Sequence, residues 1–159
     1  MEKNEKHKFM QKVIEMAIRN VEEGKGGPFA AIIVKNGKII AEGTNMVTSA
    51  NDPSAHAEIT AIRRACKTLK TFHLEDCEIY TSCEPCPMCL GAIYWARISK
   101  IYYACNRKDA SEAGFDDSKF YEEVCKRPPD RSIKMEKLLS EEGKKAFDKW
   151  LQKEDRIPY

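Results

Sequence analysis

The sequence lacks long apolar segments, an apolar leader and a strong excess of charge of either sign. The longest apolar run is Phe29–Val34, six residues, whereas a helix that crosses a bilayer needs about 20. The first eight residues, Met-Glu-Lys-Asn-Glu-Lys-His-Lys, contain no apolar region of the kind that directs secretion. The net charge is only +2, whereas nucleic-acid-binding domains are usually more basic. We therefore expect a cytoplasmic protein with no membrane partner and no nucleic-acid partner.

Disulfide scaffolds are also disfavoured, because the chain has an odd number of cysteines, seven, and no secretory signal. Three of these cysteines fall within Cys83–Cys89, a spacing that indicates metal binding or catalysis in a reducing compartment. Hydrophobic residues make up 42% and charged residues 33% of the 159 positions. That balance and that length predict one globular domain over residues 1–159.

The pattern of apolar residues alternates between strand-like and helical segments. Helical spacing or helix-start signals predict helices at 9–21, from Asp52-Pro53 to 69, from 85 to 96, near 118–124 and, capped by Ser140, at 140–152. Short apolar or alternating runs predict strands at 29–34, 39–41, 77–82, 101–104 and 132–138. Asn36-Gly37 predicts a hairpin turn between the first two strands, and we expect 105–131 to be mainly loop. Alternating strands and helices predict an α/β fold, a three-layer α/β/α sandwich with a five-stranded mixed sheet.

Two short motifs bring together residue types that bind metals and move protons. His56-Ala-Glu58 is expected by chance roughly 0.3 times in such a chain, so it means little alone. Pro85-Cys86-Pro-Met-Cys89 is expected on the order of 0.01 times and carries most of the weight. Because i and i+3 share one helix face, Cys86 and Cys89 can reach the same ion. At the start of a helix, His56 can converge on that ion too.

One imidazole and two thiolates make three ligands, which leaves the fourth position of a tetrahedral zinc site for water. Glu58 is then placed to act as a general base and afterwards as a general acid. The alternative is a closed structural site in which Cys83 adds a fourth protein ligand to His56, Cys86 and Cys89. A structural site has no use for an adjacent carboxylate, so Glu58 favours the catalytic interpretation.

With these motifs the chain resembles the cytidine/deoxycytidylate deaminase superfamily, whose signature is H-x-E with P-C-x-x-C. Within it the chain is similar to the bacterial guanine deaminases. Thr81–Ile93 and the His-Ala-Glu helix carry the superfamily resemblance, which runs through most of the chain. The finer match is carried by Gly26–Phe29, Asn45, Ser49–Pro53, Tyr94–Arg97, Glu112–Ser118 and Tyr159.

The resemblance implies a cytidine deaminase-like fold and the deamination of guanine at C2, which gives xanthine and ammonia in purine metabolism. It implies a homodimer in which a C-terminal segment, about 139–159, is exchanged and covers the neighbour's site. It also implies one zinc ion per subunit on His56, Cys86 and Cys89, with Cys83 not a ligand and with Glu58 and Asp117 as catalytic residues. The substrate-binding residues implied are Phe29, Asn45, Ala57, Trp95, Asp117 and Tyr159.

Residue chemistry allows a second interpretation for several of these positions. Phe29 and Trp95 can stack on a purine, yet either can equally be a core aromatic. Asn45 offers a donor and an acceptor to a purine edge, but an asparagine also caps loops. Asp117 can accept from the N–H groups of guanine, whereas Asp116-Asp117 also suits an ordinary turn.

Other functions share the same zinc core. A tRNA adenosine deaminase must hold a nucleic-acid backbone on a basic surface, which the small net charge and the Gly-Phe-Asp-Asp segment disfavour. Deaminases of guanosine, cytosine or triazines, and a zinc-stabilised binding module, are further alternatives.

Overall fold

The computed structural model describes residues 3–159. Its contacts divide the chain into two compact units, one ending at Asp117 and the other formed by Ser118–Tyr159. None of the helices in the described residues is both long and apolar enough to cross a membrane.

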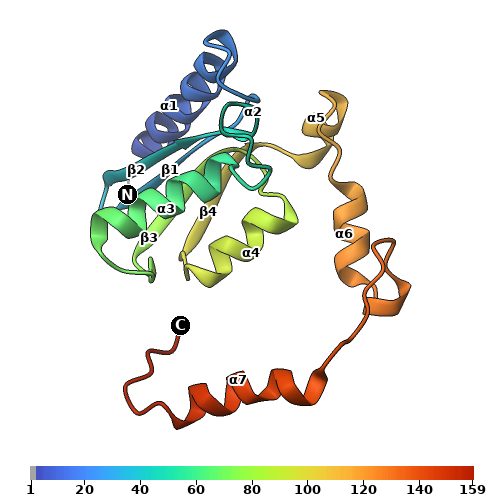
Figure 1. Ribbon diagram of the computed structural model, residues 1–159. Coiled ribbons are helices and arrows are strands. Elements are labelled where there is room, and N and C mark those ends of the chain that lie inside the picture. Colours follow the sequence, from blue (N-terminus) through green and yellow to red (C-terminus); the bar gives the residue numbers. More distant parts are fainter. Residues whose placement is uncertain (1–2) are drawn as a thin grey trace. The chain divides into compact units, whose positions relative to one another are not determined.

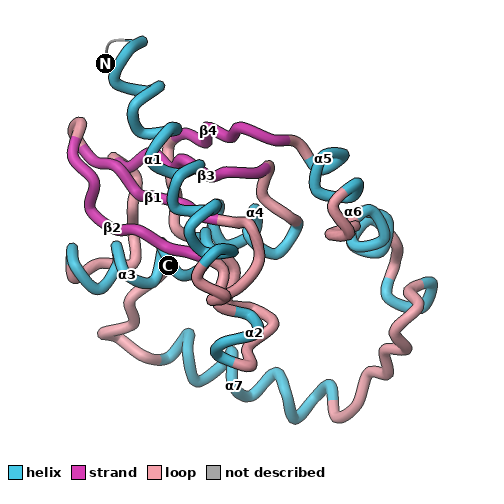
Figure 2. Tube along the Cα trace, turned by 90° about the horizontal axis from the view of Figure 1, so that it is seen from above, coloured by secondary structure: helices cyan, strands magenta, loops and turns pink. Residues whose placement is uncertain are grey.

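The first unit is built on a sheet of four strands (Figures 1 and 2). Along the sheet the strands follow the order β2-β1-β3-β4, and β1 runs antiparallel to β2 and β3, whereas β3 and β4 are parallel. Asn36 and Gly37 both have positive φ, 51° and 71°, as a tight hairpin turn of the primed type requires. The mixed sheet and its hairpin are thus confirmed. The strands are β1 (Ala30–Lys35), β2 (Lys38–Thr44), β3 (Cys77–Cys83) and β4 (Lys100–Cys105).

Helices cover both faces of this sheet, which confirms the predicted three layers. Helix α1 (Lys3–Glu22) packs on one face, and α3 (Ala57–Leu69) and α4 (Pro87–Trp95) pack on the other (Figure 1). Alternate residues of β1 and β3 enter the two cores, because successive strand side chains point to opposite faces. The core under α1 contains Val13, Ala17, Ile32 and Tyr80, and the core under α3 and α4 contains Ile33, Ala61, Ile79 and Ile93.

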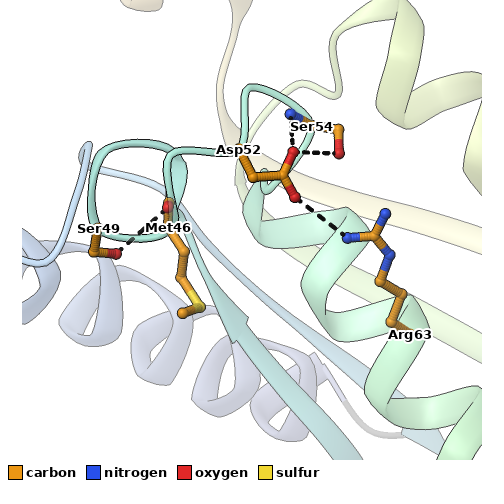
Figure 3. A network of polar contacts seen from close by, with 5 residues as sticks. All are labelled: Met46, Ser49, Asp52, Ser54 and Arg63. Carbon is orange, nitrogen blue, oxygen red and sulfur yellow. Dashed lines mark hydrogen bonds and ion pairs between the residues drawn. The ribbon is translucent and has the colours of Figure 1, made fainter.

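The predicted start of the second helix at Asp52-Pro53 is wrong. The helix begins later, so His56 and Glu58 lie at its N-terminus. The Asp52 carboxylate accepts hydrogen bonds from the Ser54 amide at 2.8 Å and the Ser54 hydroxyl at 2.7 Å, and it lies 3.9 Å from the Arg63 guanidinium (Figure 3). Asp52 therefore closes a tight turn instead of capping a helix. A short helix, α2 (Val47–Ala50), precedes this turn, and α3 begins only at Ala57, with His56 as its N-cap.

Gly43 sets how closely β2 approaches the start of α3. A Cβ atom at this position would lie 2.3 Å from the Ala57 carbonyl oxygen and 2.5 Å from the Ala61 nitrogen. Backbone therefore packs directly on backbone, and the first turn of α3, which carries Glu58, is fixed against the sheet.

The segment after β4 contains a helix where the sequence indicated only loop. Asn106 accepts hydrogen bonds from the amides of Lys108 and Asp109, and the Asp109 carboxylate accepts from the Asn106 amide. This reciprocal capping box starts α5 (Arg107–Glu112).

The second unit contains α6 (Ser118–Cys125), a 3₁₀ turn (Pro128–Asp130) and α7 (Ser140–Gln152). The fifth strand predicted at 132–138 is wrong: the Ser132 amide binds the Glu123 carboxylate at 2.7 Å, and residues 131–139 form no ladder. The sheet of the described residues therefore has four strands, and at Ser132 a side-chain carboxylate takes the place of a neighbouring strand. Ser140 is not the cap of α7 either, since Leu139 takes that position in the left-handed conformation.

Candidate metal and catalytic site

The metal-binding side chains lie at the N-termini of two helices on the same face of the sheet. His56 is the N-cap of α3, Cys86 is the N-cap of α4, and Cys89 lies in the first turn of α4. One donor atom from each of these three residues lies within 4.8 Å of the others. The fold thus brings His56 next to two cysteines that lie 30 and 33 residues later in the sequence.

The spacing of these donors fits zinc. The Nδ1 atom of His56 lies 3.6 Å from Cys86 Sγ and 3.5 Å from Cys89 Sγ. With Zn–N bonds of about 2.0 Å and Zn–S bonds of about 2.3 Å, a tetrahedral site separates nitrogen from sulfur by about 3.5 Å. His56, Cys86 and Cys89 are therefore positioned to hold one zinc ion through Nδ1 and two sulfurs.

Cys83 is not a member of this cluster. Its Sγ donates a hydrogen bond to the carbonyl oxygen of Asn106 at 3.5 Å. Burial raises the pKa of the Cys83 thiol to about 12, so this cysteine keeps its proton. The structure thus supports three protein ligands and not the closed four-ligand alternative.

The two ligand cysteines behave as a pair that shares a proton. The hydrogen bond from Cys89, helped by His56, lowers the pKa of Cys86 to about 4. The pKa of Cys89 is raised, because its proton is held by Cys86 and because it is buried. The hydrogen bond to Cys86 raises the pKa of His56. Metal ions bind deprotonated ligands and displace their protons. The lowered pKa of Cys86 therefore favours binding of a cation by these three residues.

Glu58 lies beside the cluster in the first turn of α3 and is only 6% exposed. Its Oε2 accepts a hydrogen bond from Cys89 Sγ at 3.4 Å, and its Oε1 accepts one from Thr81 Oγ1 at 3.4 Å. Burial raises the pKa of the Glu58 carboxyl group. The carboxyl group is therefore held from two sides and lies directly beside a metal-ligand sulfur.

Thr81 is a site residue that the sequence analysis missed. It is 1% exposed and lies on β3, on the side facing α3. The sequence does contain one indication of this role. Thr81 places a hydroxyl group at an inward-facing position of the apolar segment that forms β3, and a buried polar group requires a hydrogen-bond partner.

Asp117 is partly buried at the end of the first unit. Burial, followed by the charge of Cys86, raises the pKa of its carboxyl group. The charge of Asp117 in turn helps to raise the pKa of His56. The structure thus brings Asp117 into the electrostatic surroundings of the metal ligands.

Asn45 and Phe29 lie next to each other, and the Asn45 amide donates to the Phe29 carbonyl at 3.0 Å. The Oδ1 atom of Asn45 accepts from the amides of Gly27 and Val47 at 3.3 and 3.2 Å. Because both partners are N–H donors, this atom is the carboxamide oxygen. Asn45 therefore caps the loop with its oxygen, and its Nδ2 donor is left to face other partners.

The ring of Phe29 makes an edge-on contact with Phe115, with 4.9 Å between the ring centroids. Both rings line an apolar groove of about 450 Å³ beside α1. This groove is lined by neither the metal ligands nor Glu58, and Phe29 also packs against the core under α3.

The other residues implied by the resemblance are more widely distributed. Ala57 is fully buried between His56 and Glu58. Trp95 is 67% exposed at the last residue of α4, and at 1.5 Å per residue its backbone lies about 9 Å along the helix from Cys89. Tyr159 belongs to the second unit and is exposed. The roles of all three in substrate binding stay predictions.

Known proteins share both this site and this fold. Residues 3–105 match the family model of the cytidine and deoxycytidylate deaminase zinc-binding region. Guanine deaminase of Bacillus subtilis (strain 168) is 54% identical over 142 residues, 89% of this chain and 91% of that protein. The X-ray structure of guanine deaminase from Bacillus subtilis superposes with a TM-score of 0.95 at 49% identity, over 100% of this chain and 99% of that chain. The tRNA-specific adenosine deaminase of Aquifex aeolicus (strain VF5) is 43% identical over 99 residues, 62% of this chain and 65% of that protein. The chain therefore belongs to the cytidine and deoxycytidylate deaminase family of zinc-binding proteins.

Proposed function

We propose that the chain is a zinc-dependent deaminase that converts guanine and water to xanthine and ammonia. The observation that carries the proposal is the similarity to a guanine deaminase along nearly the whole chain, at 54% identity. The match to the tRNA-specific deaminase covers 62% of the chain, against 89% for the guanine deaminase. The experiment below therefore treats deamination of tRNA as an alternative outcome.

The chemistry at C2 requires one proton to be taken from water and one to be delivered to the leaving amine. When bound, zinc supplies Lewis-acid activation of water. Glu58 takes a proton from the water as its oxygen bonds to C2. Glu58 then delivers a proton to the exocyclic nitrogen as the C2–N bond breaks and ammonia leaves. The hydrogen bonds from Thr81 and Cys89 hold the carboxyl group in place for both transfers.

Recognition of guanine follows from the donors and acceptors around the cluster. O6 and N7 of guanine are acceptors, so the Nδ2 donor of Asn45 suits that edge. A carboxylate such as Asp117 can accept from the N–H groups of the ring. Stacking of Phe29 on the purine would add an apolar contact. Together these groups would favour a purine that carries both O6 and an amino group at C2.

We also propose that the chain forms a homodimer in which the C-terminal segment covers the neighbour's site, with Tyr159 as part of the cover. In support, no residue of 118–159 is buried within its own chain. The exposed large apolar side chains of residues 118–159 include Leu138, Leu139, Phe147 and Ile157. Surfaces of this kind are typical of interfaces. A cover also excludes water from the reaction.

Mixed dimers distinguish a cover that acts across the interface from one that acts on its own subunit. One subunit lacks residues 155–159, and the other carries Glu58→Gln, so each homodimer is expected to be weak or inactive. If the segment acts across the interface, the first subunit's site is complete in the mixed dimer and activity returns. Mixed dimers, confirmed with two affinity tags, that show no recovery would exclude the exchanged cover.

The activity itself is tested by measuring ammonia release from free bases, nucleosides and a tRNA anticodon stem. We expect guanine to be the preferred substrate and xanthine to form in equal amount to ammonia. Preferred deamination of adenosine in the tRNA stem would overturn the proposal in favour of the second activity. Release from none of these substrates by zinc-loaded protein would refute both.

A further inference from the structure

Asn20 is a buried polar residue on α1 that belongs to neither the metal cluster nor the predicted purine contacts. It is 2% exposed, although most asparagines lie on the surface. Its Nδ2 donates one hydrogen bond to the carbonyl oxygen of Gly27 at 2.9 Å and another to that of Asn45 at 3.0 Å. Both partners are acceptors, so the orientation of the carboxamide is determined by the contacts.

These two hydrogen bonds join the loops that carry the predicted purine contacts. Gly27 lies two residues before Phe29, and its carbonyl oxygen also accepts the Phe29 amide at 2.8 Å. Asn45 receives the second bond on its own backbone. A helix that otherwise packs against the sheet is thereby connected to both segments that carry predicted purine contacts, Phe29 and Asn45.

The loop before Phe29 and the loop at Asn45 pack closely against each other. A Cβ atom at Gly26 would lie 2.2 Å from the carbonyl oxygen of Asn45. The amide of Gly27 also donates to Asn45 Oδ1. The position of the Asn45 carboxamide thus depends on contacts at its backbone oxygen and at its side-chain oxygen.

The Oδ1 atom of Asn20 is buried and has no hydrogen-bond partner among the described residues. A buried acceptor without a partner destabilises the folded state. A leucine has the same branching but no polar atoms, so it would carry no unpaired buried acceptor. The asparagine therefore contributes chiefly through its two donated hydrogen bonds.

We propose that Asn20 is a positioning residue for the purine. It holds the loops so that Asn45 Nδ2 and the Phe29 ring face the substrate. The inference rests on the proposed function, because it assigns the residue to that same pocket. The hydrogen bonds of Asn20 go to Gly27 and Asn45, whereas the zinc ligands and Glu58 lie at the starts of α3 and α4, so its loss should weaken substrate binding and spare the chemical step.

The test is Asn20→Leu, which keeps the branching of the side chain at Cγ, is bulkier, and removes both donors. We expect the KM for guanine to rise about tenfold, while kcat stays within about twofold and zinc content is unchanged. The matched control is Val13→Ala, a fully buried position on the same helix, which should lower the melting temperature and leave KM unchanged. An equal rise in KM for the control, or no rise for Asn20→Leu, would overturn the inference.

A double-mutant cycle shows whether Asn20 acts through Asn45. Asn45→Ala should raise KM, and Asn20→Leu should add little in that background, whereas additive effects would contradict the inference. Hydrogen exchange provides a readout without substrate: Asn20→Leu should speed exchange at the Gly27 and Val47 amides more than Val13→Ala does. If wild-type protein fails on guanine, the proposed function fails, and the exchange rates still decide whether Asn20 holds the loops. If Asn45→Ala raises KM and Asn20→Leu does not, the inference alone fails.

Discussion

Replacing Glu58 by glutamine separates the proton-transfer role of this residue from its place in the fold. Glutamine has nearly the same shape and keeps an oxygen that can accept from Thr81, which lies 3.4 Å away. It cannot take up a proton from water and return it to the leaving amine. Zinc content and melting temperature should therefore stay close to those of the wild type.

The expected loss of kcat is about 10²–10⁴-fold, typical for removing a general acid–base group. At 1.36 kcal/mol per tenfold, this loss corresponds to about 3–5 kcal/mol of transition-state stabilisation. The larger value is expected here, because two proton transfers depend on one carboxyl group that is 6% exposed and that water cannot easily replace.

The assay is steady-state ammonia release from guanine, with zinc measured on the same samples. The control is Glu78→Gln, the same substitution on β3, where the carboxylate instead accepts hydrogen bonds from Tyr80 and Tyr102. The control should keep full activity. A Glu58→Gln enzyme within a few fold of the wild type would refute the proton-transfer argument.

Three further predictions follow from the geometry of the site. Cys86→Ser should lose zinc, whereas Cys83→Ser should keep it because Cys83 lies outside the donor cluster; equal zinc loss in both, measured by atomic absorption, would favour a four-ligand site. Asp117→Asn should lower kcat/KM for guanine roughly 5- to 150-fold, because an acceptor is replaced by a donor against the N–H groups of the ring, at about 1–3 kcal/mol; normal turnover would remove Asp117 from the pocket. Gly43→Ala should lower the melting temperature, because its Cβ would lie 2.3 Å from the Ala57 carbonyl oxygen, and an unchanged melting curve would contradict that close packing.

The zinc ligands could be predicted from the sequence, because Cys86 and Cys89 follow a proline at a helix start and the rare spacing dictates that both face one ion. The hairpin at Asn36-Gly37 was equally predictable, since that dipeptide tolerates two consecutive positive φ angles. Local chemistry determines these features, so no distant contact is needed to specify them.

The sequence predictions were wrong, or missed a residue, where the structure depends on a hydrogen-bond partner that the local pattern does not reveal. Residues 132–138 alternate like a strand, but the Ser132 amide binds Glu123 and forms no ladder. Asp52 carries an N-cap signal, but its carboxylate closes a turn with Ser54, and so His56 becomes the cap. The contact of Thr81 with Glu58 joins a strand to a helix 23 residues away, which no local pattern reveals.

The most direct test of the account is a titration of metal-free protein with zinc, with xanthine formation from guanine followed at each addition. The three-ligand site predicts that activity rises in proportion to added zinc and stops rising at one equivalent per chain. Full activity without metal, or no xanthine from the zinc-loaded protein, would contradict the central claim.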